Sequence, residues 1–251
     1  MSESEGDARR GLDRETIQHV AENTQVIRPP RQHLATFGVT NIRYYLVTEP
    51  SYADLLGDVP GLATEEPGRE TVVREGEIHV ERPKIVTPYY LVNLFQGFDH
   101  GREYAEFLSE TYGPQSPGLL YSYRHDLSDT NVISDSLPVV VERLEKQIDE
   151  HQSTLAAIVR GVDSLWDISL MKFVYDLTVS SLGSNVRELS RQGMLQMTGG
   201  VPAAAHMRIH DLFVGVRRGE VKAADLKEEL DLWGLFDEYQ DRFFGLFRRP
   251  G

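Results

Sequence analysis

The chain has 251 residues, of which 40% are hydrophobic and 26% are charged, as in a globular protein with a large core. It contains no cysteine, which excludes a disulfide framework, a zinc–thiolate centre, an iron–sulfur cluster and a thiol nucleophile. Its formal net charge of −13 argues against a nucleic-acid partner, because binding phosphates requires a basic face.

The first 32 residues are polar, of mixed charge and free of aromatic side chains. They predict a disordered acidic tail with one short helix over residues 14–21. The acidic start is unlike a signal peptide, which begins basic and then turns apolar. No uncharged stretch reaches the roughly 18 residues of a membrane span. We therefore expect a soluble cytoplasmic protein without membrane contact.

Residues 33–197 are expected to form an α/β body. The stretch 41–48 is rich in β-branched and aromatic residues and predicts a strand. Two short apolar runs between residues 71 and 80 flank a polar turn, which predicts a β-hairpin with Gly76 at a positive φ. The segment 84–87 lies between two prolines and predicts an edge strand or an irregular piece.

A strand–helix–strand–helix order, a βαβα unit, follows over residues 119–182. The second strand, 155–160, begins with five apolar residues in a row, which is typical of a strand covered on both faces. Leu137, Val141, Leu144 and Ile148 recur at helical spacing, which predicts a helix over 137–150 with one buried apolar stripe. Right-handed crossover through this helix would make the second strand parallel to, and a neighbour of, the strand 119–125. Gly183 is expected to end the last helix. The predicted fold class is α/β, with α+β possible, built on a mixed sheet.

The Thr198–Pro202 stretch, with two adjacent glycines and a proline, marks the start of a C-terminal helical appendage over 198–251. We expect a helical hairpin broken at Gly219 and Gly234. One face of it carries an aromatic stripe of Trp233, Phe236, Tyr239, Phe243 and Phe247. This stripe either packs onto the body or binds a protein partner or a second copy of the chain.

Charged residues at the two predicted strand ends suggest a site. Arg124, His125 and Asp126 follow the first strand, and Arg160 and Asp163 follow the second. Since neighbouring strands lie about 4.8 Å apart, the two aspartates could share Mg²⁺ or Mn²⁺. The histidine would then act as acid or base, and the arginines would bind an anionic substrate. The alternative is that these charges only solvate the rim of the sheet.

A second metal hypothesis concerns His206 and His210, which stand four residues apart on a predicted helix. This spacing clamps a transition metal in zinc helices. Here Met207 occupies the place of the usual catalytic glutamate, and no third ligand is evident, so both histidines are equally compatible with a surface role.

The sequence lacks the phosphate-binding, dinucleotide-binding and nucleophile-elbow glycine motifs. It therefore favours a non-catalytic interaction or assembly protein that uses its C-terminal aromatic hairpin and needs no cofactor. The alternative is a divalent-metal-dependent enzyme of hydrolytic or phosphoryl-transfer type, acting on an anionic small molecule at the predicted strand ends.

Overall fold

The computed structural model describes residues 14–51, 70–94 and 101–247. These residues form a five-stranded mixed sheet with helices and a C-terminal helical hairpin, which confirms the predicted fold class. The chain divides into two compact units. The first contains the described parts of residues 1–82 and 123–184, and the second those of 83–122 and 185–251. None of the described helices is long and apolar enough to cross a membrane.

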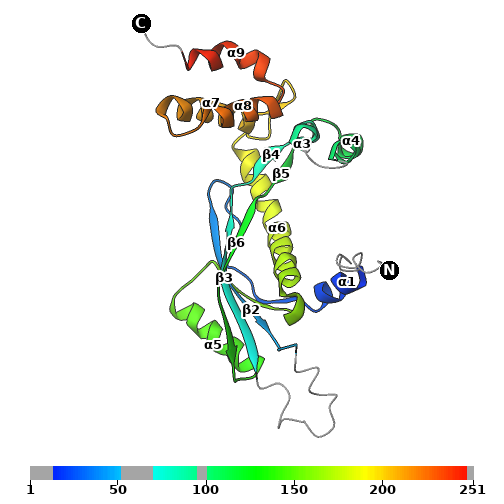
Figure 1. The fold of residues 1–251 in the computed structure, drawn as a ribbon, viewed down its shortest axis with the longest axis vertical. Coiled ribbons are helices and arrows are strands. Elements are labelled where there is room, and N and C mark those ends of the chain that lie inside the picture. Colours follow the sequence, from blue (N-terminus) through cyan, green and yellow to red (C-terminus); the bar gives the residue numbers. More distant parts are fainter. Residues whose placement is uncertain (1–13, 52–69, 95–100, 248–251) are drawn as a thin grey trace, which may run out of the picture. The chain divides into compact units, whose positions relative to one another are not determined.

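The sheet of the first unit has the strand order β1-β7-β2-β3-β6, in which β7 and β2 are parallel and the other neighbours are antiparallel. Two helices cover opposite faces of this sheet (Figure 1). The strands are β1 (Gln25–Arg28), β2 (Thr40–Thr48), β3 (Thr71–Val80), β6 (Tyr123–Ile133) and β7 (Ala156–Arg160), and the helices are α5 (Leu137–Glu150) and α6 (Trp166–Arg191).

The prediction of a fully covered strand at β7 is confirmed. Ala157, Ile158 and Val159 have no exposed surface, because β1 and β2 flank the strand and helices cover both of its faces. The apolar stripe predicted for α5 is also confirmed, with Leu144 and Ile148 packed into the core on that side of the sheet.

The prediction that the two strands of the βαβα unit are neighbours in the sheet is wrong. Strands β6 and β7 run in the same direction, but β2 and β3 lie between them. The physical reason is the long antiparallel pairing of β6 with β3, whose register runs from Thr71 opposite Ile133 to Val80 opposite Tyr123. A crossover helix dictates strand direction, but it does not dictate which strands become neighbours.

The predicted hairpin over residues 71–80 is also wrong, since β3 is one continuous strand. Gly76 lies inside the strand, at a register shift in the β3–β6 ladder. A Cβ at Gly76 would stand 2.4 Å from the Asp126 carbonyl oxygen and 2.5 Å from the Tyr44 hydroxyl. The glycine is therefore needed for close approach between strands and not for a turn.

The predicted tail is ordered over much of its length. The short helix is confirmed as α1 (Arg14–Glu22), whose Val20 is 1% exposed. The next residues form β1 against β7, so the expected disorder is wrong for residues 25–28. Residues 1–13 lie outside the described part of the chain.

Helix α6 runs through Gly183 to Arg191, so the predicted stop at Gly183 is wrong. An interior glycine costs a helix only about 1 kcal/mol. The buried side chains of Phe173 and Leu177 anchor the preceding turns of this 26-residue helix. Tertiary packing thus outweighs the local preference of one glycine.

The second unit groups the C-terminal helices with the described parts of residues 83–122 and 185–197, which were expected to belong to the α/β body. Helix breaks at Gly219 and Gly234 are confirmed, and both glycines have positive φ values. Its elements are β4 (Lys84–Val86), α3 (Pro88–Leu94), α4 (Gly101–Tyr112), β5 (Gly118–Leu120), β8 (Met197–Thr198), β9 (Val201–Pro202), α7 (Ala203–Arg218), α8 (Ala223–Leu232) and α9 (Phe236–Gly245).

Candidate functional site

The two aspartates predicted to share a cation lie on opposite faces of the sheet. Asp126 contacts His79, whose ring Nε2 is 3.0 Å from Oδ2, and His79 Nδ1 is 2.8 Å from Asn41 Oδ1. Asp163 instead accepts a hydrogen bond of 2.8 Å from Thr48. Asn41 and Thr48 stand at odd and even positions of the same strand, so their side chains project to opposite faces.

The two aspartates also lie at different heights along the strands. Across the sheet, Asp126 on β6 pairs with Glu77 on β3, and Glu77 pairs with Arg43 on β2. Asp126 therefore lies level with Arg43, which is five residues before Thr48, the β2 residue that binds Asp163. Five residues of strand span roughly 16 Å. A metal ion bound by both carboxylates is therefore contradicted, because each ligand must approach the ion to about 2.0–2.6 Å.

The remaining residues of that hypothesis are likewise separated. Arg124 forms a 3.4 Å ion pair with Asp126 and is 73% exposed, as expected for rim charges. His125 lies on the α6 side of the sheet, where its Nε2 is 2.7 Å from the Tyr44 hydroxyl and its ring lies 5.9 Å from that of Trp166. This histidine supports the sheet and is not joined to either carboxylate.

Tyr44 is fully buried beneath this contact, and burial raises its pKa to about 12, although the charge of Arg74 opposes the shift. We expect Tyr44→Phe to cost about 1 kcal/mol of unfolding free energy through the lost hydrogen bond to His125. Since the folded pKa exceeds the unfolded value near 10, the phenol contributes stability that is lost as the pH rises. Urea unfolding should show the difference between wild type and variant shrinking above about pH 10; a growing difference would contradict this.

No group of three or more metal-ligating side chains occurs within the described ranges. His210 Nδ1 is 3.3 Å from the Arg242 guanidinium, a cation that would repel a bound metal. The Nε2 atom of His206 is buried without a hydrogen-bond partner, and Met207 is 53% exposed. Among the residues that the structure describes, no third ligand joins this i,i+4 pair of histidines.

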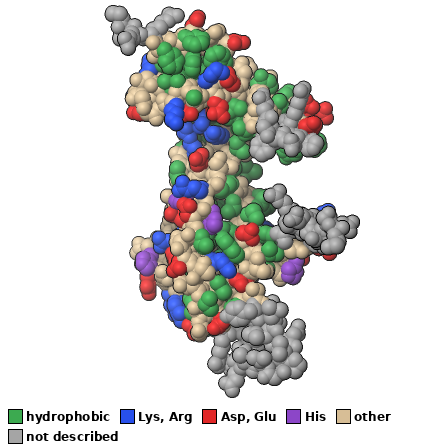
Figure 2. All heavy atoms as spheres, viewed as in Figure 1, with side chains coloured by type: hydrophobic (Ala, Val, Ile, Leu, Met, Phe, Trp, Pro, Cys, Tyr) green, Lys and Arg blue, Asp and Glu red, His purple; other side chains and the backbone are tan. Residues whose placement is uncertain are grey.

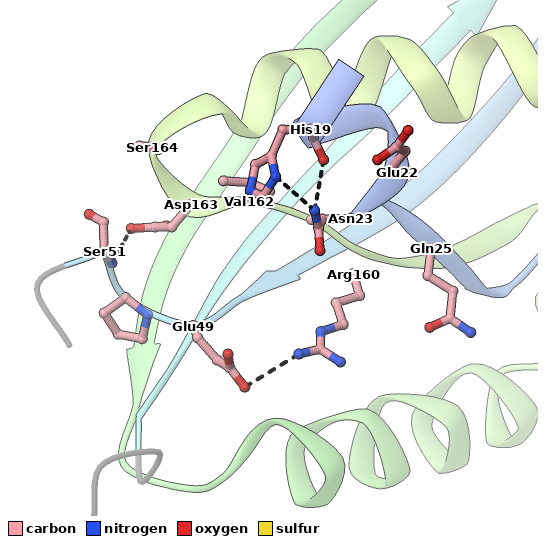
Figure 3. A pocket seen from close by; sticks show the side chains of 12 residues that line it. His19, Glu22, Asn23, Gln25, Glu49, Ser51, Arg160, Val162, Asp163 and Ser164 are labelled. Carbon is pink, nitrogen blue, oxygen red and sulfur yellow. Dashed lines mark hydrogen bonds and ion pairs between the residues drawn. The ribbon is translucent and has the colours of Figure 1, made fainter. Parts of the chain in front are cut away.

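Arg160 and Asp163 do line a pocket, of about 440 Å³, at the carboxyl ends of the parallel strands β2 and β7. Figure 3 shows its walls, which come from the end of α1 with His19 and Asn23, the end of β2 with Glu49, and the turn after β7. The lining is mainly polar. The position agrees with the rule that α/β sheets bind ligands at strand carboxyl ends.

Asp163 holds the turn after β7 in place. It accepts hydrogen bonds from Arg74 at 2.8 Å, from Thr48 at 2.8 Å and from the Ser51 amide at 3.1 Å. Burial alone would raise its pKa, but these donors outweigh burial and hold the pKa below its ordinary value. Asp163 is therefore a structural anion and has little capacity left for a ligand.

A second surface of the first unit carries an exposed apolar stripe on α6, formed by Met171, Tyr175, Val179 and Leu182. These side chains are 59%, 65%, 53% and 43% exposed. Figure 2 shows hydrophobic side chains reaching the surface where α6 runs. We call these four residues the α6 stripe.

Strand β6 borders this stripe and forms one edge of the five-stranded sheet. Ten of its eleven residues are exposed, Ile133 being the exception. Tyr123 contacts Thr178, which follows Tyr175 by three residues and precedes Leu182 by four. The start of the edge strand and the α6 stripe therefore form one continuous surface.

The C-terminal aromatic residues are mostly core. Trp233 and Phe243 are 3% and 7% exposed, and Phe236 and Tyr239 pack partly buried against the same cluster. Only Phe247 of the predicted binding face is widely exposed, at 60%. Of the two alternatives for this stripe, packing therefore describes Trp233, Phe236, Tyr239 and Phe243, which lie in the core cluster of the second unit.

No protein-family model, curated protein or solved structure matches this chain. The pocket and the α6 stripe with β6 are the two surfaces of the first unit that could carry a function. The helical spacing of Met171, Tyr175, Val179 and Leu182 is a signal in the sequence that could have indicated a second apolar face on α6. The pocket has no such signal, because its walls come from three segments that are distant in the sequence.

Proposed function

We propose that this chain is a non-catalytic assembly protein that pairs with a second copy of itself through β6 and the α6 stripe. The observation that carries the proposal is an exposed edge strand beside an exposed apolar helix face. This proposal moves the interaction surface from the C-terminal hairpin, where the sequence suggested it, to the first unit.

The edge strand offers unpaired backbone groups along its outer side. Such edges are usually short or covered, because they template pairing with another chain. At eleven residues β6 is long for an edge, and no other described strand pairs with its outer side. Pairing with another strand would satisfy these backbone groups and extend the sheet.

The apolar area is of the size that a dimer needs. Three exposed apolar side chains of β6, Tyr123, Leu127 and Val132, add to the four of the α6 stripe. At about 200 Å² for each fully exposed large side chain, these seven side chains together expose on the order of 700 Å² along the strand and the helix. That total approaches the roughly 800 Å² that each partner buries in a standard interface.

One feature favours a second copy as the partner. Antiparallel pairing of two β6 strands about a twofold axis near Ser128, the middle residue of the strand, would satisfy the outer backbone groups of both copies with the same edge. Tyr123 of β6 contacts Thr178, which precedes Val179 of the α6 stripe, so each copy presents the strand and the stripe together. A symmetric dimer uses one patch twice and is the commonest assembly.

The first test is sedimentation velocity of the full chain. We expect a species of about twice 28.4 kDa, and we expect Tyr175→Lys with Val179→Lys to convert it to monomer. Placing two charges in an apolar interface leaves them desolvated without partners, which should weaken association at least a hundredfold. A wild-type monomer at all concentrations would refute the proposal.

Ser180→Lys is the matched control, because Ser180 is exposed on the same helix about 100° away from its neighbour Val179. It adds the same charge outside the α6 stripe and should leave the dimer intact. Loss of the dimer in this variant would point to a general charge effect.

Because the chain has no cysteine, a single introduced thiol reports one contact. Ser128→Cys near the middle of β6 should form a disulfide-linked dimer on mild oxidation, while Gln147→Cys on the exposed side of α5 should not. Equal cross-linking of both variants would indicate random collision and count against pairing through β6.

The proposal includes a cytoplasmic location, with which the cysteine-free composition is compatible. It also includes a protein partner and not a nucleic acid, which the net charge of −13 supports.

A further inference from the structure

The pocket at the ends of β2 and β7 has charged groups that the fold itself does not use. Asp163 is saturated by its three donors, and the Asn23 amide donates to the His19 carbonyl at 2.8 Å. Arg160 and Glu49 differ from these residues. Their closest N–O distance is 3.6 Å, and their side chains are 47% and 58% exposed.

A separation of 3.6 Å is too long for a charge-assisted hydrogen bond, which is about 2.7–2.9 Å. Neither the guanidinium nor the carboxylate is therefore satisfied by the other. Figure 3 shows both side chains extending into the same open space below His19 and Asn23. Each retains hydrogen-bonding capacity for a group of opposite charge.

Gln25 adds an amide beside the guanidinium. It is the direct cross-strand partner of Arg160 in the β1–β7 ladder, so the two side chains project from the same face of the sheet. A planar guanidinium with an amide N–H beside it suits a carboxylate, which accepts bonds at both oxygens.

Carboxylates line the same pocket. Glu49 adjoins Arg160, and Glu22 stands on the wall formed by α1, where one of its oxygens accepts a bond of 2.9 Å from Gln18. A simple anion placed on Arg160 would be repelled by these groups, and a simple cation placed on them would be repelled by Arg160. A ligand that carries both charges avoids either repulsion.

We infer that this pocket binds a small zwitterion of the α-amino acid class. Its carboxylate bonds to Arg160 and Gln25, and its ammonium bonds to Glu49, with Glu22 adding negative potential. The volume of about 440 Å³ accommodates an amino acid with its side chain. This binding is separate from the proposed pairing, because the pocket uses neither β6 nor the α6 stripe.

The test is a thermal melt of the full chain with each standard L-amino acid at millimolar concentration, followed by calorimetric titration of the compound that raises the melting temperature most. For alanine, the matched fragments are propionate, which lacks the ammonium, and ethylamine, which lacks the carboxylate. We expect the amino acid to bind at least tenfold more tightly than either fragment, because each fragment loses one charge-assisted interaction.

Arg160→Gln and Glu49→Gln should each weaken binding at least tenfold. Arg124→Gln is the matched control, since Arg124 is also an exposed strand arginine with a long ion pair but lies outside the pocket. Melts without ligand establish that the variants fold. Three results would overturn the inference: no shift with any amino acid, equal binding of propionate, or binding that survives Arg160→Gln.

Discussion

Gly76→Ala is expected to lower the free energy of unfolding by about 3 kcal/mol. The added methyl group would lie 2.4 Å from the Asp126 carbonyl oxygen and 2.5 Å from the Tyr44 hydroxyl. The first of these atoms belongs to the backbone of β6, so the clash cannot be relieved by turning a side chain. The β3–β6 ladder must separate locally, and Tyr44 must leave its position next to His125. Urea denaturation followed by circular dichroism measures the change.

Gly38→Ala is the control for this substitution. A Cβ at Gly38 meets no atom within 4 Å, and its φ is outside the left-handed region. Replacing it should be neutral or stabilise the chain by about 0.5 kcal/mol, because alanine has less freedom in the unfolded state. If both variants lost a similar amount of unfolding free energy, the close contacts at Gly76 would not be the reason that this position requires glycine.

The second large effect is expected for Asp163→Asn, which should also lower the free energy of unfolding by about 3 kcal/mol. Asp163 and Arg74 are each 14% exposed and form a 2.8 Å ion pair. Without the carboxylate, the Arg74 guanidinium stays largely buried beside a neutral amide, with the Trp166 ring 5.4 Å away. Removing one partner of a buried pair costs more than the pair itself contributes, since the other charge is left uncompensated.

The contribution of Asp163 to the free energy of unfolding is expected to depend on pH. The pKa of Asp163 is lower in the folded chain than the value near 3.9 of an unfolded aspartate. Its contribution is therefore complete above about pH 4 and is lost as the pH falls through the folded pKa. Unfolding curves of wild type and Asp163→Asn should converge in acid; a difference that does not change with pH would contradict the assignment.

Asp176→Asn provides the surface comparison. Asp176 pairs with Lys172 one helical turn away, and the two side chains are 41% and 33% exposed. Solvent screens such a pair, so its loss should cost about 0.5 kcal/mol or less. A cost equal to that of Asp163→Asn would show that burial does not distinguish the two pairs.

Several elements could be predicted from local pattern alone. The uninterrupted apolar run that became β7 and the regular stripe that became α5 were identified because burial demands the same periodicity in any fold. Gly219 and Gly234 were identified as helix breaks because a positive φ at those points favours glycine in any context. In each case the physical cause is contained within a few neighbouring residues.

The candidate sites depended on distant residues. Met171 and Val179 are hydrophobic like Phe173 and Leu177, yet only the latter two are buried, because the sheet covers one side of α6 and nothing described covers the other. The Asp126–Asp163 hypothesis failed for the same kind of reason, since it required a strand neighbourhood that β2 and β3 occupy.

The sequence by itself therefore determined the fold class, the covered strand and the C-terminal helical hairpin, all of which follow from local periodicity and backbone preference. Tertiary structure alone decided the order of the strands, the need for glycine at position 76, and the meeting of Arg160, Gln25 and Glu49 in one pocket. These features arise where segments far apart in the chain come into contact, and the energy of such contacts is not encoded in any short stretch of residues.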